Sequence, residues 1–236
     1  VQDITELKEL EQEKQQKDSL LIQQSKMATM GEMIGNIAHQ WKQPLSLISM
    51  SNGLVKLNQE DSDFCTQDEI NDAVENIDNS VQHLSSTIDD FRDFFKPDKE
   101  RIYFNLKDTF NKIYKLMNSQ LKNNSILIID KIDDIEVYGY KNELLQVFIN
   151  VIKNAKDELI KLPNDRKRVL FVSMYTENND AIIKIKDTAG GIPTDIIDKV
   201  FDAYFTTKES EEGTGIGLYM SNQIIEGMKG SIEVSN

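Results

Sequence analysis

Residues 70–95, INDAVENIDNSVQHLSSTIDDFRDFF, contain the apolar series that decides the fold of this part of the chain. Apolar side chains recur there at alternating intervals of four and three residues, at positions 70, 74, 77, 81, 84, 88, 91 and 95. This spacing places one apolar stripe along a helix. Pro97 follows, and proline cannot continue a helix because it lacks the backbone N–H. The stretch therefore predicts a long amphipathic helix that ends before Pro97.

A similar series precedes it, at positions 27, 30, 34, 37, 41 and 48, and only Pro44 interrupts the spacing. The polar residues 58–68 separate the two series. Two helices joined by a short polar loop predict an antiparallel hairpin over residues 27–97. Each stripe leaves apolar surface facing outward, so we expect two chains to complete a four-helix bundle as a homodimer. Residues 1–26 have sparser apolar positions and predict a solvated helix or a weak coiled coil.

The pattern changes after Pro97, where short strand-like runs alternate with helical ones. We expect helices over residues 104–118, 143–162 and 218–228, and strands over 126–129, 169–175 and 181–186, with a last strand starting at 231–234. This mixture predicts an α/β sandwich with one helical face over residues 101–236, whose last strand is truncated. The chain as a whole is thus of the α+β class.

Composition limits the possible functions. The 236 residues include 27 Lys and Arg against 40 Asp and Glu, a net charge of −13. So acidic a chain repels a polyanion, which argues against nucleic acid as a partner. A phosphate ligand would need local donors or a bridging Mg²⁺. A single cysteine, Cys65, excludes an internal disulfide, and the apolar runs are too short to span a membrane. Because residue 1 is Val1, we expect a piece of a longer protein.

His39 is the first candidate for chemistry. If Ile34 and Trp41 take heptad position a and Ile37 position d, His39 falls at f, which points away from the helix seam. An exposed imidazole can accept a phosphoryl group, although most exposed helical histidines are ordinary surface residues. Pro44 lies five residues on and is expected to bend the helix just past His39. The other histidine is interpreted as a surface residue.

Asn150 and Asn154 form the second candidate, within QVFINVIKNA at residues 146–155. Their spacing places both amides on one helix face, where the carbonyl oxygens can ligate a hard cation. A polar pair opposite an apolar face is also what a solvated surface would have. Asp187 begins the third candidate, DTAGGIP, directly after a predicted strand. Its carboxylate could accept a hydrogen bond from an adenine amine, but Asp before glycines is also typical of a turn.

The glycine run GTGIGL at residues 213–218 opens a helix. Alternating glycines and a helix N-terminus can present backbone N–H groups to phosphates, although a lone run of this kind is weak evidence. The preceding residues, KVFDAYFTTK at 199–208, could be a helical turn and a flexible loop, or a loop that covers a nucleotide.

Taken together and in this order, the motifs resemble those of the sensor histidine kinases of two-component signalling. HQWKQPL at residues 39–45 resembles the H-box of that family, residues 150–155 its N-box, and residues 187–191 its G1 box. Residues 201–208 and 213–218 are similar to its F-box and G2 box, and residues 230–235 resemble the start of its closing strand. The sequence DITE at residues 3–6 is similar to the tail of a PAS sensor domain.

The resemblance implies ATP-dependent autophosphorylation of His39, followed by phosphoryl transfer to an aspartate of a response regulator receiver domain. It implies that Asn154 ligates Mg²⁺ with support from Asn150, and that Asp187 binds adenine. The remaining ATP-binding residues that it implies are Lys153, Gly191, Ile192, Phe201, Thr206, Thr207, Lys208, Gly213, Thr214, Gly215, Ile216, Gly217 and Leu218. It further implies a sensor domain upstream in the same chain and a cytoplasmic place for this fragment, with any membrane anchor upstream.

Three positions depart from the family pattern. Gln40 stands where the family usually has an acidic residue after the histidine, and Ala189 stands for the first glycine of the G1 box. Gln43 occupies the position where phosphatases of the family carry Thr or Asn; its amide could still orient a water molecule, so reverse phosphatase activity stays open. Two alternatives remain. One is an ATPase of the chaperone and topoisomerase type, which would need a Glu where Asn150 stands. The other is a non-enzymatic dimeric scaffold.

Overall fold

The computed structural model describes residues 4–61, 64–95, 100–208 and 214–236, apart from the side chains of some helical residues, His39 and Gln40 among them. It divides into two compact units. One is Thr29–Lys96, and the other combines Val1–Ala28 with Pro97–Asn236. In the part of the chain that is described, no helix combines the length and the apolar character that crossing a membrane requires.

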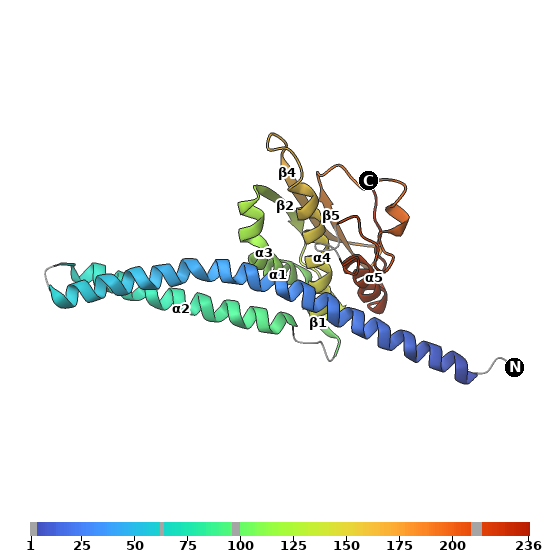
Figure 1. Ribbon diagram of the computed structural model, residues 1–236, viewed down its shortest axis with the longest axis horizontal. Coiled ribbons are helices and arrows are strands. Elements are labelled where there is room, and N and C mark those ends of the chain that lie inside the picture. The colour runs from blue at the N-terminus through green and yellow to red at the C-terminus, as the bar shows by residue number, and fades with distance from the viewer. Residues whose placement is uncertain (1–3, 62–63, 96–99, 209–213) are drawn as a thin grey trace. The chain divides into compact units, whose positions relative to one another are not determined.

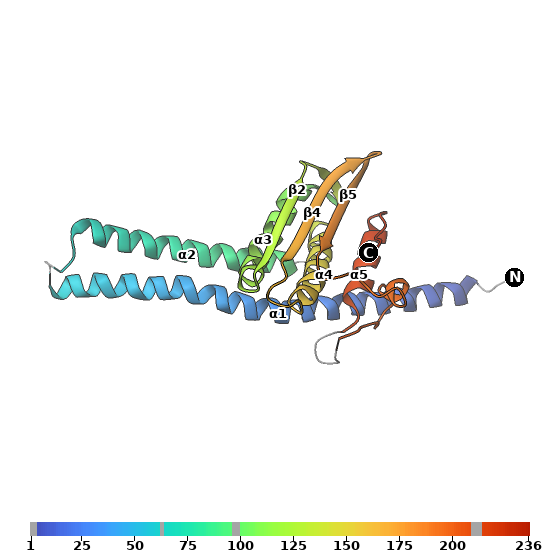
Figure 2. The same cartoon turned by 90° about the horizontal axis from the view of Figure 1, so that it is seen from above.

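Two long helices build the hairpin. Helix α1 spans Ile4–Glu60 and contains Pro44 in its interior, so the proline does not end the helix. Helix α2 spans Gln67–Phe95 and lies beside the second half of α1 in both views (Figure 1, Figure 2). The predicted helices and the polar loop between them are therefore confirmed. The first residues described, which precede the predicted hairpin, belong to the same continuous helix α1.

Helix α2 begins with a capping box. The hydroxyl of Thr66 accepts from the backbone N–H of Glu69 at 3.3 Å, and Glu69 Oε2 accepts from the backbone N–H of Thr66 at 2.8 Å. These bonds satisfy N–H groups that have no partner within the helix. The hydrogen bond from the Thr66 backbone, together with that from its hydroxyl, lowers the pKa of the Glu69 carboxyl. The start of the second helix is thus encoded locally, three residues before its first apolar position.

The buried residues of the hairpin are small. Ala73, Ser80 and Thr87 recur every seven residues along α2 and are 2%, 6% and 8% exposed. The neighbouring Val74, Val81 and Ile88 are about half exposed, at 46%, 51% and 48%. The apolar stripe predicted from the sequence therefore lies only partly inside the hairpin of one chain.

The second unit contains two sheets. β2 (Ile126–Ile132) runs parallel to β4 (Arg168–Glu177), which pairs antiparallel with β5 (Asp180–Asp187). A two-stranded antiparallel sheet joins β1 (Ile102–Asn105) to β3 (Glu136–Gly139).

Helices α3 (Leu106–Asn123) and α4 (Lys141–Leu159) pack against the larger sheet, and α5 (Gly217–Gly227) packs on α4 (Figure 2). A short 3₁₀ helix, Ile197–Lys199, precedes the loop that leads to α5. This arrangement confirms the predicted sandwich with one helical face.

Local sequence explains how these elements begin and end. Asn105 caps α3, because its Oδ1 accepts from the backbone N–H of Asp108 at 3.1 Å. Asn178 and Asn179 have φ of 48° and 71°, which gives the tight turn between β4 and β5. The guanidinium of Arg168 donates to the carbonyls of Asn124 and Leu162, at 3.0 and 2.8 Å, and so holds the ends of α3 and α4 at the start of β4.

Three details differ from the prediction. Phe104 lies in β1 rather than in a helix, and α3 begins two residues later because Asn105 caps it. β3 was not expected, since four residues that pair with one short strand leave little periodicity. The strand predicted at 231–234 is not observed: the described end of the chain carries no strand pairing, and its bond to Ile192 runs through the side chain of Asn236.

Candidate functional site

Asn150 lies in the contact between α4 and α5 and is 6% exposed. Its Nδ2 donates to the carbonyl of Gly217 at 3.0 Å and to Ser221 Oγ at 3.3 Å. Its Oδ1 accepts from Gln146 Nε2 at 3.3 Å. The amide predicted to support a metal therefore also joins the helix that carries the N-box motif to the helix that follows the glycine run.

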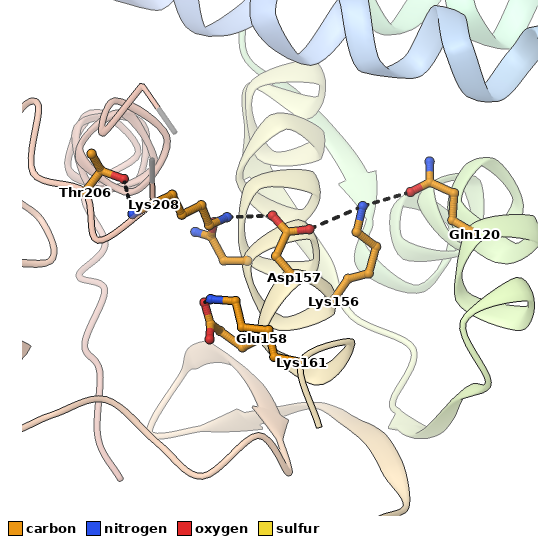
Figure 3. Close-up of polar contacts among 8 residues, drawn as sticks. Gln120, Lys156, Asp157, Glu158, Lys161, Thr206 and Lys208 are labelled. Atoms are coloured by element: carbon orange, nitrogen blue, oxygen red, sulfur yellow. Dashed lines mark hydrogen bonds and ion pairs between the residues drawn. The ribbon is translucent and has the colours of Figure 1, made fainter. Parts of the chain in front are cut away.

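Asn154 lies one turn further along α4, where its side chain is half-buried. Its Oδ1 is 3.5 Å from Lys208 Nζ, and the same ammonium is 2.5 Å from Asp157 Oδ2. Figure 3 shows Lys208 reaching α4 from the loop on one side. The backbone N–H of Lys208 donates to the hydroxyl of Thr206 at 3.1 Å, which shapes the end of that loop. Two of the predicted site residues, Asn154 and Lys208, are thus brought together.

Asp157 was not predicted, and it is the centre of this cluster. Its other oxygen lies 3.4 Å from Lys156 Nζ, which in turn donates to Gln120 Oε1 on α3 at 3.1 Å (Figure 3). The side chains of Lys156, Asp157 and Lys208 are 11%, 20% and 18% exposed. Interactions between charges at such positions are screened less than at an open surface. A polar network therefore runs from α3 through α4 to Lys208.

The glycine run at residues 213–218 is joined to residues 201–208 by a backbone hydrogen bond. Gly215 has φ of +64°, and its carbonyl accepts from the backbone N–H of Tyr204 at 3.0 Å. A Cβ at residue 215 would overlap the backbone of Tyr204. Gly217 opens α5 opposite the side chain of Asn150. The glycines thus place residues 201–208 and the start of α5 beside α4.

The other residues predicted around this run are Phe201 and Leu218, which are half-buried, Ile216, which is buried, and Thr206, Thr207 and Thr214, which are exposed. Lys153 is half-buried on α4. Gly213 lies outside the described residues.

Asp187 ends β5 and organises its own loop. Its Oδ1 accepts from the backbone N–H of Ala189 at 2.8 Å, and Thr188 Oγ1 accepts from the backbone N–H of Val169 at 3.1 Å. Gly190 and Gly191 have φ of +109° and +85°, a conformation that favours glycine. The backbone of Ile192 exchanges two hydrogen bonds with the side chain of Asn236. Within the described ranges, these contacts tie Asp187 to its loop rather than to Asn154 or Lys208.

His39 and Gln43 lie in the helical unit, within α1, and Gln43 is exposed. The backbone of His39 is helical, whereas its side chain and that of Gln40 are outside the described set. All the predicted nucleotide residues that are described belong to the other unit.

The donor set beside Lys208 fits a divalent cation. An amide oxygen from Asn154 and a carboxylate from Asp157 are hard ligands of the kind that Mg²⁺ takes, and a positive group already lies beside both. Among the residues that the structure describes, no group of three or more His, Cys, Asp and Glu side chains could hold a metal ion by itself. A metal here would therefore depend on ligands from a bound phosphate group as well.

Comparisons with known proteins match two separate parts of the chain to two families. Residues 29–100 match the family described as His Kinase A (phospho-acceptor) domain. Residues 139–236 match the family described as histidine kinase-, DNA gyrase B-, and HSP90-like ATPase.

Similar proteins include sporulation kinase A of Bacillus subtilis, 27% identical over 229 residues that cover 95% of this chain and 35% of the relative. Sporulation kinase E of the same species is 29% identical, over 99% of this chain and 29% of the relative. The chain thus spans about a third of these relatives. The solved complex of histidine kinase ThkA with response regulator protein TrrA is similar in fold, with a TM-score of 0.51 at 20% identity; the match covers 99% of this chain and 64% of that one.

The paired domains and these relatives define the class. The chain carries the phospho-acceptor domain and the ATPase domain that sensor histidine kinases of two-component signalling combine. The second domain is of the ATP-binding type that its family description names.

Proposed function

We propose that the chain binds ATP with Mg²⁺ beside α4, phosphorylates His39, and passes the phosphoryl group to an aspartate of a response regulator. The observation that carries this proposal is the convergence of Asn154, Asp157 and Lys208, with Lys208 coming from the loop that Gly215 holds through the backbone of Tyr204. Oxygen ligands, an ammonium and glycine backbone at one place are what a nucleotide triphosphate needs.

The residues of the second unit would position the nucleotide. Asn154 would hold Mg²⁺, with Asp157 beside it, and the metal when bound neutralises charge on the phosphates. Asp187 would accept from the adenine amine at the end of β5, where no atoms lie near the Cβ position of Gly190. Asn150 would orient α5, whose N-terminus would face the phosphates together with Gly215. These roles account for the predicted N-box, G1 and G2 motifs.

His39 would be the nucleophile. A ring nitrogen attacks the γ-phosphorus of ATP, the bond from that phosphorus to the bridging oxygen breaks, and ADP leaves. The imidazole then gives up its remaining proton to the surrounding water. Gln40 cannot take this proton, but the unprotonated nitrogen of a neutral imidazole carries a free lone pair and needs no base to attack.

The rest of the organisation belongs to the same proposal. Residues 27–97 would form the dimeric phosphoacceptor hairpin, residues 101–236 the catalytic domain, and residues 1–26 the connection to an upstream sensor domain. A receiver domain would dock to take the phosphoryl group from His39. The solved complex of histidine kinase ThkA with response regulator protein TrrA contains such a pair of proteins, which supports this partner class. The amide of Gln43 could orient a water molecule, which would allow reverse phosphatase activity as a second activity.

The two alternatives have less support. An ATPase of the chaperone type would use a carboxylate base at position 150, where Asn150 cannot take a proton and its Oδ1 already accepts from Gln146. The hypothesis of a non-enzymatic scaffold rests on Gln40 and Ala189 alone. The polar cluster of Asn154, Asp157 and Lys208 supports nucleotide binding instead.

The test is autophosphorylation with γ-labelled ATP and Mg²⁺. We expect label that is labile to acid and stable to alkali, as a phosphohistidine is, and we expect it to disappear in His39→Gln. His83→Gln is the matched control and should keep the label. Label that persists in His39→Gln would contradict the assignment, and no label in the unaltered protein would favour the scaffold.

A further inference from the structure

The Lys208 ammonium occupies the position where a divalent cation is expected. It lies 3.5 Å from Asn154 Oδ1. It also lies 2.5 Å from Asp157 Oδ2 (Figure 3). The two charged side chains are 18% and 20% exposed, so the pair is largely withdrawn from water. A protonated amine therefore contacts the same two oxygens that would serve a metal ion.

An ammonium and a metal ion cannot share this position. Two cations bound to the same amide oxygen would lie within a few ångströms of each other and repel strongly in a partly buried place. When a metal binds Asn154 Oδ1, the Lys208 ammonium must leave that oxygen. The long flexible stem of lysine allows such a change without a change in the fold.

The surroundings of Asp157 favour this exchange. Its second oxygen faces Lys156 Nζ at 3.4 Å, and Lys156 is held by Gln120 on α3. Asp157 therefore keeps a cationic partner when Lys208 leaves. Removing one member of an isolated buried ion pair would leave an uncompensated charge, which is costly. Here the second lysine lowers that cost.

We propose that the Lys208 ammonium is an internal counter-ion that takes the place of the divalent cation at Asn154 until the metal–nucleotide complex binds, and that Asp157 is the positioning residue that holds it there. This inference rests on the proposed nucleotide binding and goes beyond it, because it gives Lys208 a role that is exchanged with the metal. When nucleotide binds without metal, Lys208 supplies the positive charge that the phosphates need. When metal is present, that contribution is replaced.

The experiment measures binding of the non-hydrolysable ATP analogue adenylyl imidodiphosphate to the full chain by calorimetry, once with Mg²⁺ and once with EDTA. Lys208→Met should weaken metal-free binding about tenfold or more, the size expected for loss of a charge-assisted contact. With Mg²⁺ the same variant should change affinity less than about threefold. Asp157→Asn should weaken metal-free binding in the same direction by a smaller factor, because Lys208 is retained but no longer held.

Lys161→Met is the matched control. Lys161 also pairs with an acidic residue of the same region, Glu158, with Nζ 2.7 Å from Oε1, but these side chains are 61% and 46% exposed (Figure 3). An exposed pair of this kind contributes little, and it lies outside the cluster around Asn154. We expect both affinities to stay as in the unaltered protein.

Equal losses with Mg²⁺ and with EDTA in Lys208→Met would overturn the inference, since Lys208 would then bind phosphate alongside the metal. In Lys208→Met, an unchanged ratio between the affinities with Mg²⁺ and with EDTA, together with a lower unfolding temperature, would also overturn the inference. The ion pair between Lys208 and Asp157 would then serve only the stability of the fold. Failure of the unaltered protein to bind the analogue with Mg²⁺ would reject the proposed function itself. The two failures are therefore distinguishable.

Discussion

Gly215 fixes the path of the backbone between the F-box and G2 motifs. With φ of +64° it adopts a left-handed conformation that costs other residues roughly 1–2 kcal/mol. Its carbonyl accepts from Tyr204, and a Cβ would overlap the Tyr204 backbone, which cannot yield as a flexible side chain does. Any larger residue must therefore push residues 201–208 away from the start of α5.

Gly215→Ala should accordingly impair nucleotide binding more than folding. We expect the affinity for adenylyl imidodiphosphate with Mg²⁺ to fall by about tenfold or more, since left-handed strain and displacement of the loop both act on the site. Calorimetry gives the affinity, and thermal unfolding shows whether the domain remains folded. Gly227→Ala is the control, because no atoms lie near its Cβ position and its φ is not left-handed. Normal binding by Gly215→Ala would show that the close approach to Tyr204 is not needed.

The conformation or role of a single residue is predictable where its cause lies in the neighbouring sequence. The glycines of DTAGG and GTGIGL stand out because closely spaced glycines indicate a backbone path that residues with a Cβ rarely take, and Gly190, Gly191 and Gly215 do have positive φ. Asp157 was missed because a carboxylate on the polar face of a helix looks like any solvated residue. Its partner Lys208 is 51 positions away, and only the fold brings them together.

At the scale of elements, Asn150 joins α4 to α5. The amide donates to Gly217 and Ser221 and accepts from Gln146, all in the interior between the two helices. The sequence predicted the shared helix face of Asn150 and Asn154, but not that one amide turns toward α5 while the other meets Lys208. The difference arises from partners that are distant in sequence: α5 supplies Gly217 and Ser221 to Asn150, and the loop before it supplies Lys208 to Asn154.

Asn150→Asp separates the two roles of this residue. A carboxylate remains a good metal ligand but cannot donate to the Gly217 carbonyl, and its charge would be buried. We expect the free energy of unfolding to fall by about 3 kcal/mol, measured by urea denaturation without metal. Asn222→Asp makes the same chemical change at a more accessible position of α5, where Asn222 donates to Glu226, and should cost well under about 1 kcal/mol. Unaltered stability in Asn150→Asp would show that the amide is not a structural link.

Helices were predicted better than short strands, for physical reasons. The 3.6-residue period of α2 and α4 persists over 29 and 19 residues, so it stands out from chance. β1 and β3 have four residues each and stabilise one another only as a pair, so neither carries a pattern of its own. The residues at 231–234 have strand-like composition, but a strand also needs a neighbour with which to pair, and composition does not supply one.

At the scale of the molecule, the hairpin leaves several of its large apolar residues exposed. Within one chain the small residues Ala73, Ser80 and Thr87 are buried, whereas Val74, Val81 and Ile88 form an exposed stripe beside them. On α1, Leu45, Leu47, Met50 and Leu57 are 40–64% exposed. A monomer would keep this surface in contact with water at a cost of roughly 25 cal/mol per Å². A second hairpin of the same kind would cover it without any change of fold, which is the basis of the proposed dimer.

Val81→Lys should therefore convert the proposed dimer to a monomer. Val81 is 51% exposed in the single chain, and the dimer would bury a lysine there without a partner, which should weaken association by about 100-fold or more. Sedimentation equilibrium measures the mass, and circular dichroism checks that helix content is kept. Asn79→Lys adds the same charge to α2 two residues earlier, about 200° around the helix at an exposed position, and should leave the dimer intact. Loss of the dimer in both variants would indicate a general effect of charge, and a dimer in Val81→Lys would place the interface on another face of the hairpin.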